Sequence, residues 1–347
     1  MSGFRRIARA AVAAAVVWAG LAGAAAADET IQAGDPGAAK RFKVFLVTWR
    51  GCEFACKGFI DYFKTQKINA DIVHRDANRD KTKMPDFVEE AKAMKVDLVV
   101  TWGTTTALSI LGTFDHDDPA TRITKIPAMF MIVSQPVGVK LVKDFGPSGR
   151  NITGTIYLVP EETQLKLART YRPFKRMAVV YNAAEKNSTL SVKNLKKLAE
   201  KEGWTLLERP VPVAADGKPD KAALPGIVAE LAAERPEWFY QGPDSFLNVN
   251  RDLYTSEANS HGVPVFAAGE NPVRASNALL GVVNRYYNVG QFTGARAEQV
   301  LLKGKKPGEM PINSPSRFSI IINMKTAKKL QLYPPLNLLK FSDVITE

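Results

Sequence analysis

The feature that most constrains this chain is a regular alternation of short apolar runs with segments of helical spacing. In the first half, runs rich in Val, Leu, Ile and Phe alternate with segments whose apolar residues recur every three or four positions. A strand that is apolar at every position is buried on both faces, and the intervening helices supply the cover. The pattern predicts an open α/β sheet with parallel strands over 42–48, 70–74, 97–102 and 128–133 and helices over 56–65, 84–94 and 105–111.

The alternation starts again after residue 151. Gly203 marks the end of a long helix in this half, because helices often stop on a glycine in the left-handed conformation. A chain of 347 residues has room for about two domains, so we predict two Rossmann-like lobes with parallel sheets. The second half is expected to contain helices over 161–171, 188–202, 221–234, 248–260, 289–302 and 325–330 and strands over 177–181, 204–210, 238–241, 264–268, 279–283 and 317–323.

The N-terminus has the pattern of a secretory signal peptide. Arginines within residues 5–9 form a basic head, residues 10–22 are an apolar stretch rich in Ala and Val, and small residues end at Ala27. These parts predict export to the periplasm with cleavage near Ala27, so that residues 1–27 are removed. A membrane anchor is the weaker alternative, because the apolar stretch is shorter than the roughly 20 residues that span a bilayer. Residues 28–40 are expected to form a loose leader.

The formal net charge of +12 raises the question of an anionic partner. Lysines and arginines are scattered, and neither a basic stretch interleaved with aromatics nor a zinc-finger spacing occurs, so nucleic-acid binding is not expected. Residues 115–118 are three acids and a histidine, but a turn before Pro119 explains them better than a metal site. No nucleophile elbow, P-loop, zinc-protease or dinucleotide motif is present. We therefore expect no metal, no cofactor and no enzyme activity.

Aromatic and small polar residues follow the predicted strands, at the edge where ligands bind to open parallel sheets. If the first sheet has the strand order 2-1-3-4, the strands beside Trp49 and Trp102 are neighbours, and both indoles are expected to line one pocket. Packing in the core is the alternative for each tryptophan. The candidate ligand-binding residues are Trp49, Arg50, Trp102, Gly103, Thr104, Thr105, Ser134, Gln135, Tyr157, Asn182, Gln241, Asp244, Glu270 and Tyr286.

The charged candidates and the helix start each have a second interpretation. The threonines after Gly103 begin a helix whose free N–H groups suit a carboxylate, or they simply cap it. Arg50 suits a ligand carboxylate, or is an ordinary surface arginine. Asp244 and Glu270 suit an ammonium group, or cap helices. The Gly-Pro-Asp-Ser context of Asp244 is typical of a cap.

Cys52 and Cys56 are the two cysteines of the chain. In an exported protein we expect them to form a disulfide, which would close a small loop and brace the turn that follows Trp49. Free buried thiols are the second alternative. A metal or redox site is the third, and it is disfavoured because a redox motif has two residues between its cysteines and not three.

A set of motifs links the middle and the end of the chain. They are Asn151-Ile152-Thr153-Gly154, Leu158-Val159-Pro160-Glu161-Glu162, Asn182-x-x-Glu185-x-Asn187-Ser188, Tyr286-Tyr287-x-x-Gly290-x-x-x-Gly294 and Lys303-Gly304-x-x-Pro307-Gly308, with Lys57-Gly58-Phe59 and Ser134-Gln135-Pro136-Val137-Gly138 in the first half. With these motifs the chain resembles the ABC transporter substrate-binding proteins related to the tryptophan- and tyrosine-binding group.

The resemblance implies a type I periplasmic binding protein fold, in which two lobes are joined by a three-segment hinge. The crossings are expected near 151–157, 284–287 and 313–317. The first lobe would then hold residues 41–152 with about 286–314, and the second lobe residues 153–285 with about 315–347.

The resemblance also implies a function. The lobes would close on a small carboxylate-bearing ligand, of which an aromatic amino acid is one form, and an ABC permease in the inner membrane would read the closed shape. A monomer is expected. A ligand-sensing module for a membrane receptor and a periplasmic enzyme are the alternatives. The loops at 49–53, 102 and 241–244 depart from the family pattern, so the ligand of the relatives does not transfer directly.

Overall fold

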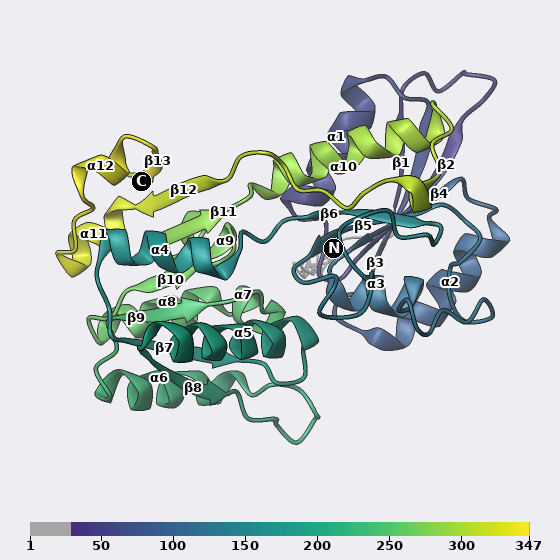
Figure 1. Cartoon of the computed structure of the whole chain (residues 1–347). Helices are drawn as coiled ribbons and strands as arrows, with labels where there is room; N and C mark the ends of the chain where they lie inside the picture. The colour runs from purple at the N-terminus through teal and green to yellow at the C-terminus, as the bar shows by residue number, and fades with distance from the viewer. Residues whose placement is uncertain (1–28, 347) are drawn as a thin grey trace, which may run out of the picture.

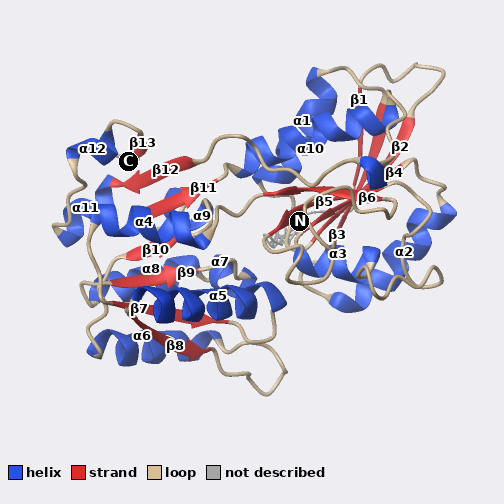
Figure 2. Ribbon diagram, in the orientation of Figure 1, coloured by secondary structure: helices blue, strands red, loops and turns tan. Residues whose placement is uncertain are grey.

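The computed structural model describes residues 29–346, which form two lobes side by side, each built on one sheet (Figure 1). The expected signal peptide, residues 1–27, lies outside the described residues. Figure 2 shows helices packed around the strands of each lobe. The predicted α/β architecture with two sheets of mostly parallel strands is confirmed. Among residues 29–346, no helix is both long enough and apolar enough to span a bilayer.

The first lobe contains a six-stranded sheet in the order β1-β3-β2-β4-β5-β6. Every neighbouring pair is parallel except β1 with β3. The four inner strands have the expected 2-1-3-4 order, which puts the carboxyl ends of β2 and β4 next to each other. The strands are β1 (Glu29–Ala33), β2 (Phe42–Thr48), β3 (Ala70–Asp76), β4 (Leu98–Trp102), β5 (Ala128–Val133) and β6 (Ile152–Ile156).

Two helices that are far apart in sequence, α1 and α10, pack together in the first lobe (Figure 1). Their contact requires glycine: a Cβ on Gly290 would lie 2.0 Å from the carbonyl oxygen of Ala55, and one on Gly58 would lie 2.2 Å from that of Tyr287. These motif glycines therefore hold α10 against α1, and Tyr286 at its start reaches the junction of the lobes. The helices of this lobe are α1 (Phe54–Thr65), α2 (Met84–Ala93), α3 (Thr104–Leu111) and α10 (Tyr286–Leu301).

The second lobe contains a seven-stranded sheet in the order β13-β12-β11-β10-β9-β7-β8, in which only β11 and β12 are antiparallel. Helix α4 packs beside α5, and α6 beside α8. The strands are β7 (Arg176–Tyr181), β8 (Thr205–Pro210), β9 (Trp238–Gln241), β10 (Val265–Ala267), β11 (Leu280–Val283), β12 (Ser319–Asn323) and β13 (Ser342–Ile345). The helices are α4 (Glu161–Tyr171), α5 (Lys186–Glu202), α6 (Leu224–Ala233), α7 (Ser245–Val249), α8 (Arg251–Ser260), α9 (Asn271–Arg274), α11 (Met324–Leu330) and α12 (Leu336–Leu339).

Three segments connect the lobes. The first lies between β6 and α4, the second between β11 and α10, and the third leads from Asn313, which forms a bridge with Thr155, to β12. Asn284 in the second segment donates from Nδ2 to the carbonyl oxygen of Tyr157 in the first, at 2.8 Å. Hydrogen bonding between the segments keeps them close together where the chain passes from one lobe to the other.

Three local expectations are wrong. Residues 28–40 are not all a loose leader, because Glu29–Ala33 pairs with β3 as an edge strand, which Arg41 fastens by donating to the carbonyl oxygen of Ala33 at 3.1 Å. Residues 152–156 pair with β5 as the last strand of the first sheet, so the connection begins after Ile156 and not at 151. The helix expected over 248–260 is two helices, α7 and α8, which meet at Asn250.

Candidate functional site

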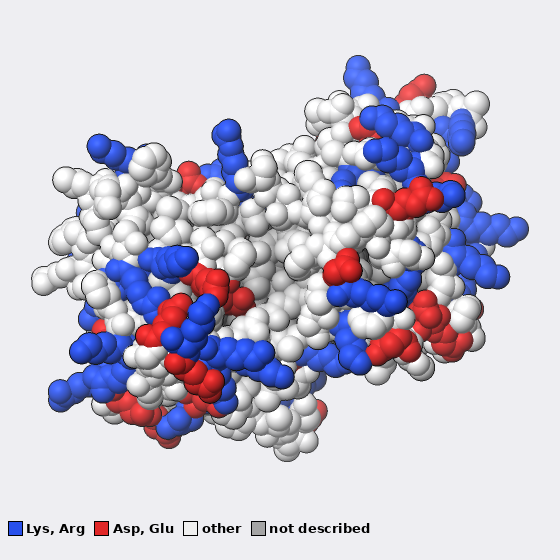
Figure 3. Space-filling model, viewed as in Figure 1, with Lys and Arg blue, Asp and Glu red and all other residues white. Residues whose placement is uncertain are grey.

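A hollow lies between the lobes, at the carboxyl ends of β2, β4 and β5 on one side and of β9 and β10 on the other. Open parallel sheets bind ligands at this edge. About 520 Å³ there is not filled by protein atoms, a volume that includes space open to solvent. Figure 3 shows mainly uncharged residues where the lobes meet. The lining residues are Trp49, Arg50, Trp102, Gly103, Thr104, Ile132, Tyr157, Asn187, Gln241, Gly242, Pro243, Asp244, Ser245, Asn248, Gly269, Pro272 and Tyr286.

Aromatic rings form much of the wall. Trp49 and Trp102 stand at the ends of the adjacent strands β2 and β4, and both are buried. Tyr157 and Tyr286 come from the first two connections between the lobes, and their rings meet edge to face with centres 5.5 Å apart. Burial raises the pKa of both phenols above the ordinary value, so both stay neutral at physiological pH. These rings offer flat apolar surfaces to a ligand.

Arg50 links the aromatic wall to the second lobe. Its guanidinium lies over the Trp102 ring, 4.8 Å from the ring centre, in an attractive cation–π arrangement. Its Nε donates to Glu53 Oε1 at 2.7 Å and its Nη1 to Ser245 Oγ at 3.0 Å. Burial is the largest single effect and lowers the pKa of Arg50, but Glu53, Tyr286 and Glu185 together raise it by more, so the net shift is upward. The charge of Arg50 is thus balanced within the protein, which weakens its expected role as the partner of a ligand carboxylate.

Two further hydrogen bonds join the lobes directly. Asn271 Nδ2 of the second lobe donates to Glu53 Oε2 at 3.2 Å. Gln135 Nε2 of the first lobe donates to Glu161 Oε1 of the second at 3.1 Å. Together with the bond from Arg50 to Ser245, these contacts hold the two lobes against each other across the hollow. The two lobes are therefore in direct contact in this structure.

Three buried polar atoms of the lining have no hydrogen-bond partner within residues 29–346. They are the indole Nε1 atoms of Trp49 and Trp102, which are donors, and the side-chain oxygen of Gln241, which is an acceptor. Leaving a buried polar group unpaired costs about 1–3 kcal/mol. A ligand that carries both acceptors and donors would remove this penalty.

The N-terminus of α3 lies at the hollow. Gly103 precedes the helix with a φ of 98°, a conformation that glycine adopts without strain. No side chain caps the helix, because the residue at the cap position is Gly103. The Thr106 hydroxyl, in the first turn of the helix, donates to the carbonyl oxygens of Trp102 and Gly103, at 2.6 and 2.8 Å. Gly103 and Thr104 line the hollow. The partial positive charge of this helix end therefore favours an anionic group there.

Asp244 uses its carboxylate within the second lobe. Its Oδ1 accepts from the backbone N–H of Leu247 at 2.9 Å, and its Oδ2 accepts from the N–H of Asn182 and the hydroxyl of Ser188, each at 2.7 Å. Burial raises the pKa of Asp244. The structure therefore matches the helix-cap interpretation of Asp244. Asp244 also borders the hollow.

Glu270 does not reach the hollow. Its Oε2 accepts from the backbone N–H of Tyr286 at 2.8 Å, and its Oε1 pairs with Arg274 Nε at 2.7 Å. Oε2 therefore fixes the start of α10, and with it the Tyr286 ring, while Oε1 is used by Arg274 of α9. The expected contact of Glu270 with a ligand ammonium group is not supported by this placement.

Glu185 is a half-buried acid next to the site that the candidate set missed. Its Oε2 accepts from the backbone N–H of Ser245 at 2.9 Å and from Asn187 Nδ2 at 3.3 Å. Burial, followed by the nearby Asp244 carboxylate, raises the pKa of Glu185 to about 6. The motif around Asn182 contains this residue, but a motif does not reveal which of its members lies beside another acid.

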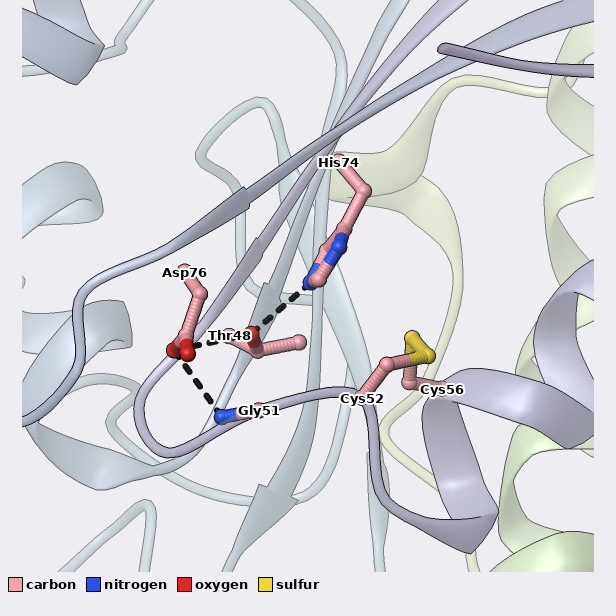
Figure 4. Close-up of a disulfide and its surroundings, with 6 residues drawn as sticks. All are labelled: Thr48, Gly51, Cys52, Cys56, His74 and Asp76. Atoms are coloured by element: carbon pink, nitrogen blue, oxygen red, sulfur yellow. Dashed lines mark hydrogen bonds between the residues drawn. A yellow bond between two sulfur atoms is a disulfide. The ribbon is translucent and has the colours of Figure 1, made fainter. Parts of the chain in front are cut away.

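A disulfide braces the loop that carries Arg50 and Glu53. The predicted Cys52–Cys56 bond is present, with Cα atoms 5.1 Å apart. Figure 4 shows the same turn held from β3, where Asp76 Oδ1 accepts from the backbone N–H of Gly51 at 2.9 Å. Because the turn is fixed at both ends, the Arg50–Glu53 pair is presented to the second lobe from a rigid support.

The hollow brings together most of the predicted site residues. Those in its lining are Trp49, Arg50, Trp102, Gly103, Thr104, Tyr157, Gln241, Asp244 and Tyr286. Thr105, Ser134, Gln135, Asn182 and Glu270 lie outside it. Sequence reasoning missed Ile132, Asn187, Gly242, Pro243, Ser245, Asn248, Gly269 and Pro272. Several of these are neighbours of predicted residues on the same loops, so their position directly after a strand could have identified them. Ile132 lies inside a strand, and nothing in the sequence marks it as a site residue.

The acids near residue 116 are used in ion pairs. Asp115 pairs with Lys140 at 2.7 Å and Asp117 with Arg150 at 3.2 Å. Within the described part of the chain, no group of three or more His, Cys, Asp or Glu residues is arranged to hold a metal ion.

Comparisons with known proteins cover nearly the whole described chain. A family model described as ABC transporter substrate binding protein matches residues 46–345. A tyrosine-binding protein of Clostridioides difficile (strain R20291) is 27% identical over 293 residues, which is 83% of this chain and 79% of the relative. The crystal structure of a conserved domain protein from Vibrio cholerae is 25% identical, with 88% of this chain and 99% of that chain covered and a TM-score of 0.76. An ABC domain from Streptococcus pneumonia, in complex with L-Trp, is 24% identical, with 88% and 100% covered and a TM-score of 0.75. The predicted type I periplasmic binding protein fold is confirmed by these likenesses.

Proposed function

This chain belongs to the ABC transporter substrate-binding protein family, and from that membership we propose that it is the exported, solute-capturing component of an importer that closes over one small amino acid-like ligand. The ligand carries a carboxylate, and an aromatic amino acid is the first candidate. The protein works in the periplasm as a monomer and delivers its ligand to an ABC permease of the inner membrane.

One observation carries this proposal. Two indole N–H donors and one amide acceptor, all buried and unpaired within the described chain, belong to residues that line a hollow walled by aromatic rings. An α-amino acid offers carboxylate oxygens to such donors and to the N-terminus of α3, and an ammonium group to the oxygen of Gln241. An aromatic side chain would pack against the rings of Tyr157 and Tyr286. The relative that is named a tyrosine-binding protein supports the same ligand class.

Lobe closure supplies the proposed mechanism. In an open form, the two walls of the hollow separate and the bonds from Arg50 to Ser245 and from Asn271 to Glu53 are lost, because each joins opposite lobes. A ligand that contacts both walls binds the closed form better and shifts the population toward it. The permease would read that shape, and no covalent bond is made or broken.

Two other functions use the same closure. A sensory module would pass the closed shape to a membrane receptor. Genes for a permease and an ATPase beside the gene for this protein would argue against the sensory function. A periplasmic enzyme would need a nucleophile with a positioned base, whereas the acids of the site, Asp244 and Glu185, accept hydrogen bonds from backbone N–H groups of their own lobe. Release of a product from the bound ligand would favour the enzyme.

The test is to identify the bound solute. Native mass spectrometry of protein purified without refolding should reveal one bound molecule in the mass range of an amino acid. Calorimetric titration with L-tyrosine, L-tryptophan and L-phenylalanine should then give saturable binding, with a decrease in the radius of gyration by solution scattering. A scattering profile that stays the same at saturating ligand would refute hinge closure, and failure of all three amino acids to bind would refute the ligand class.

A further inference from the structure

Ile132 adopts a backbone conformation that β-branched residues almost never have. It lies in β5 with a φ of 56°, in the left-handed region. None of the other non-glycine residues with positive φ in the described chain is β-branched. They are Lys67, Asn78, Arg79, Lys95, Lys140, Arg235 and Gln331. A strained residue of this kind persists only where the surrounding structure holds it, and such residues gather at ligand sites.

A β-bulge produces this conformation. Phe130 pairs with Gly154 and Val133 pairs with Ile156, so two residues of β5 stand opposite the single residue Thr155 of β6. The register before the bulge is fixed by the Phe130 ring, which lies 2.3 Å from where a Cβ of Gly154 would be. A bulge re-aims the side chain it carries. Side chains of a strand normally alternate between the two faces of the sheet. The bulge interrupts this alternation at Ile132, whose side chain lines the hollow.

The side chain of Ile132 contributes only shape to the hollow. It is 5% exposed and has no polar atom, whereas neighbouring parts of the lining carry the indole N–H groups of Trp49 and Trp102. We infer that Ile132 is the residue that selects ligand size, with its branched side chain limiting the depth available to the ligand side chain. This inference rests on the proposed function, because it assigns a determinant within the same site.

Two substitutions separate the size effect from the strain. Ile132→Ala removes three carbon atoms from the lining and keeps a Cβ in the left-handed conformation. Ile132→Gly removes these three atoms and the Cβ as well, and with the Cβ it removes the strain. The control is Lys95→Gly, which removes a side chain at a similar φ of 50° on an exposed residue away from the hollow.

The measurement is the ratio of the dissociation constants for L-phenylalanine and L-tryptophan, determined by titration calorimetry for the wild type and each variant. One methylene in an apolar pocket changes discrimination by about tenfold or more. We therefore expect the ratio to move toward the larger tryptophan by at least tenfold in both Ile132 variants, and to stay constant in the Lys95→Gly control. We also expect a higher melting temperature for Ile132→Gly than for Ile132→Ala, the reverse of the usual order in a strand.

The outcomes are distinguishable. Binding of both amino acids with a ratio unchanged within twofold in folded Ile132 variants overturns size selection and leaves the proposed function standing. A melting temperature of Ile132→Gly below that of Ile132→Ala overturns the assignment of strain. If the wild type binds neither amino acid, size selection among these ligands is overturned, and if L-tyrosine also fails to bind, the ligand class itself is wrong.

Discussion

Ser245→Ala removes the hydrogen bond by which Arg50 joins the first lobe to the second. Ser245 Oγ accepts from Arg50 Nη1 at 3.0 Å, and these residues belong to opposite lobes. A hydrogen bond to a charged group contributes about 1.5–3 kcal/mol. Arg50 keeps its two bonds to Glu53, at 2.7 and 3.3 Å, so its charge is not left unpaired and the lower end of the range applies. We expect ligand affinity to fall about tenfold, which corresponds to about 1.4 kcal/mol.

The assay is titration calorimetry with the ligand identified by mass spectrometry, together with solution scattering at half-saturation. The backbone N–H of Ser245 still donates to Glu185 in the variant, so the free energy of unfolding should change by less than about 0.5 kcal/mol. Ser256→Ala is the matched control, because the Ser256 hydroxyl accepts from Asn277 Nδ2 at 3.1 Å entirely within the second lobe. It should leave affinity unchanged.

Either of two results would refute this reasoning. If Ser245→Ala binds within twofold of the wild type, the bond to Arg50 does not contribute to closure. If Ser256→Ala loses affinity equally, the loss in Ser245→Ala reflects general damage to the second lobe and not a missing contact between lobes.

Three other predictions test separate parts of the site. Since the pKa of Glu185 is raised to about 6 from 4.5, its carboxylate destabilises the folded state above pH 6 and not below pH 4.5. Glu185→Gln should therefore raise the free energy of unfolding by up to about 2 kcal/mol at pH 8 and by almost nothing at pH 4.5, as measured by urea unfolding; an equal gain at both pH values would contradict the shift. Trp102→Ala should weaken capture at least tenfold, about 1.4 kcal/mol in a binding titration, and unchanged affinity in a folded variant would remove Trp102 from the site. Reduction of Cys52–Cys56 should lower the free energy of unfolding by about 2 kcal/mol, the chain-entropy value for so short a loop; the Cys52→Ser/Cys56→Ser double variant should show the same loss and no response to reductant.

The fold was largely predictable because its inner strands are apolar at nearly every position. Val44 to Val47 of β2 are fully buried, and a run of this kind fits only the middle of a sheet covered on both faces. The edge strand β1 and the last strand β6 were missed, because short strands at the edge of a sheet depend on their neighbours for stability. β1, for example, is held by Arg41, which lies outside the strand and bonds its last residue.

The site was predictable only in part, since three-dimensional pairing decides what a charged side chain does. The tryptophans could be placed from strand order alone. The sequence does not, by contrast, identify the partners of the charged residues. It does not show that Glu53 neutralises the charge of Arg50, or that both Asp244 oxygens accept hydrogen bonds inside the second lobe. Ile132 gave no signal at all, because its left-handed conformation comes from the register of β5 against β6.

Under the proposed mechanism, contacts that favour closure of the lobes and unpaired atoms that oppose it make free-energy contributions of similar size. This balance would let a small ligand control closure. Three bonds between lobes favour closure, each by about 0.5–3 kcal/mol depending on charge; they run from Arg50, Asn271 and Gln135. Against them stand the unpaired indole and amide atoms of Trp49, Trp102 and Gln241, at about 1–3 kcal/mol each. A ligand that pairs with those atoms removes the opposing contribution and keeps the favourable one. Substitution of Gln241 by the similarly shaped but apolar Met should therefore raise the closed fraction without ligand, seen as a smaller radius of gyration, while it weakens the binding of an ammonium-bearing ligand. A variant that stayed equally open and bound equally well would show that the unpaired amide oxygen does not oppose closure.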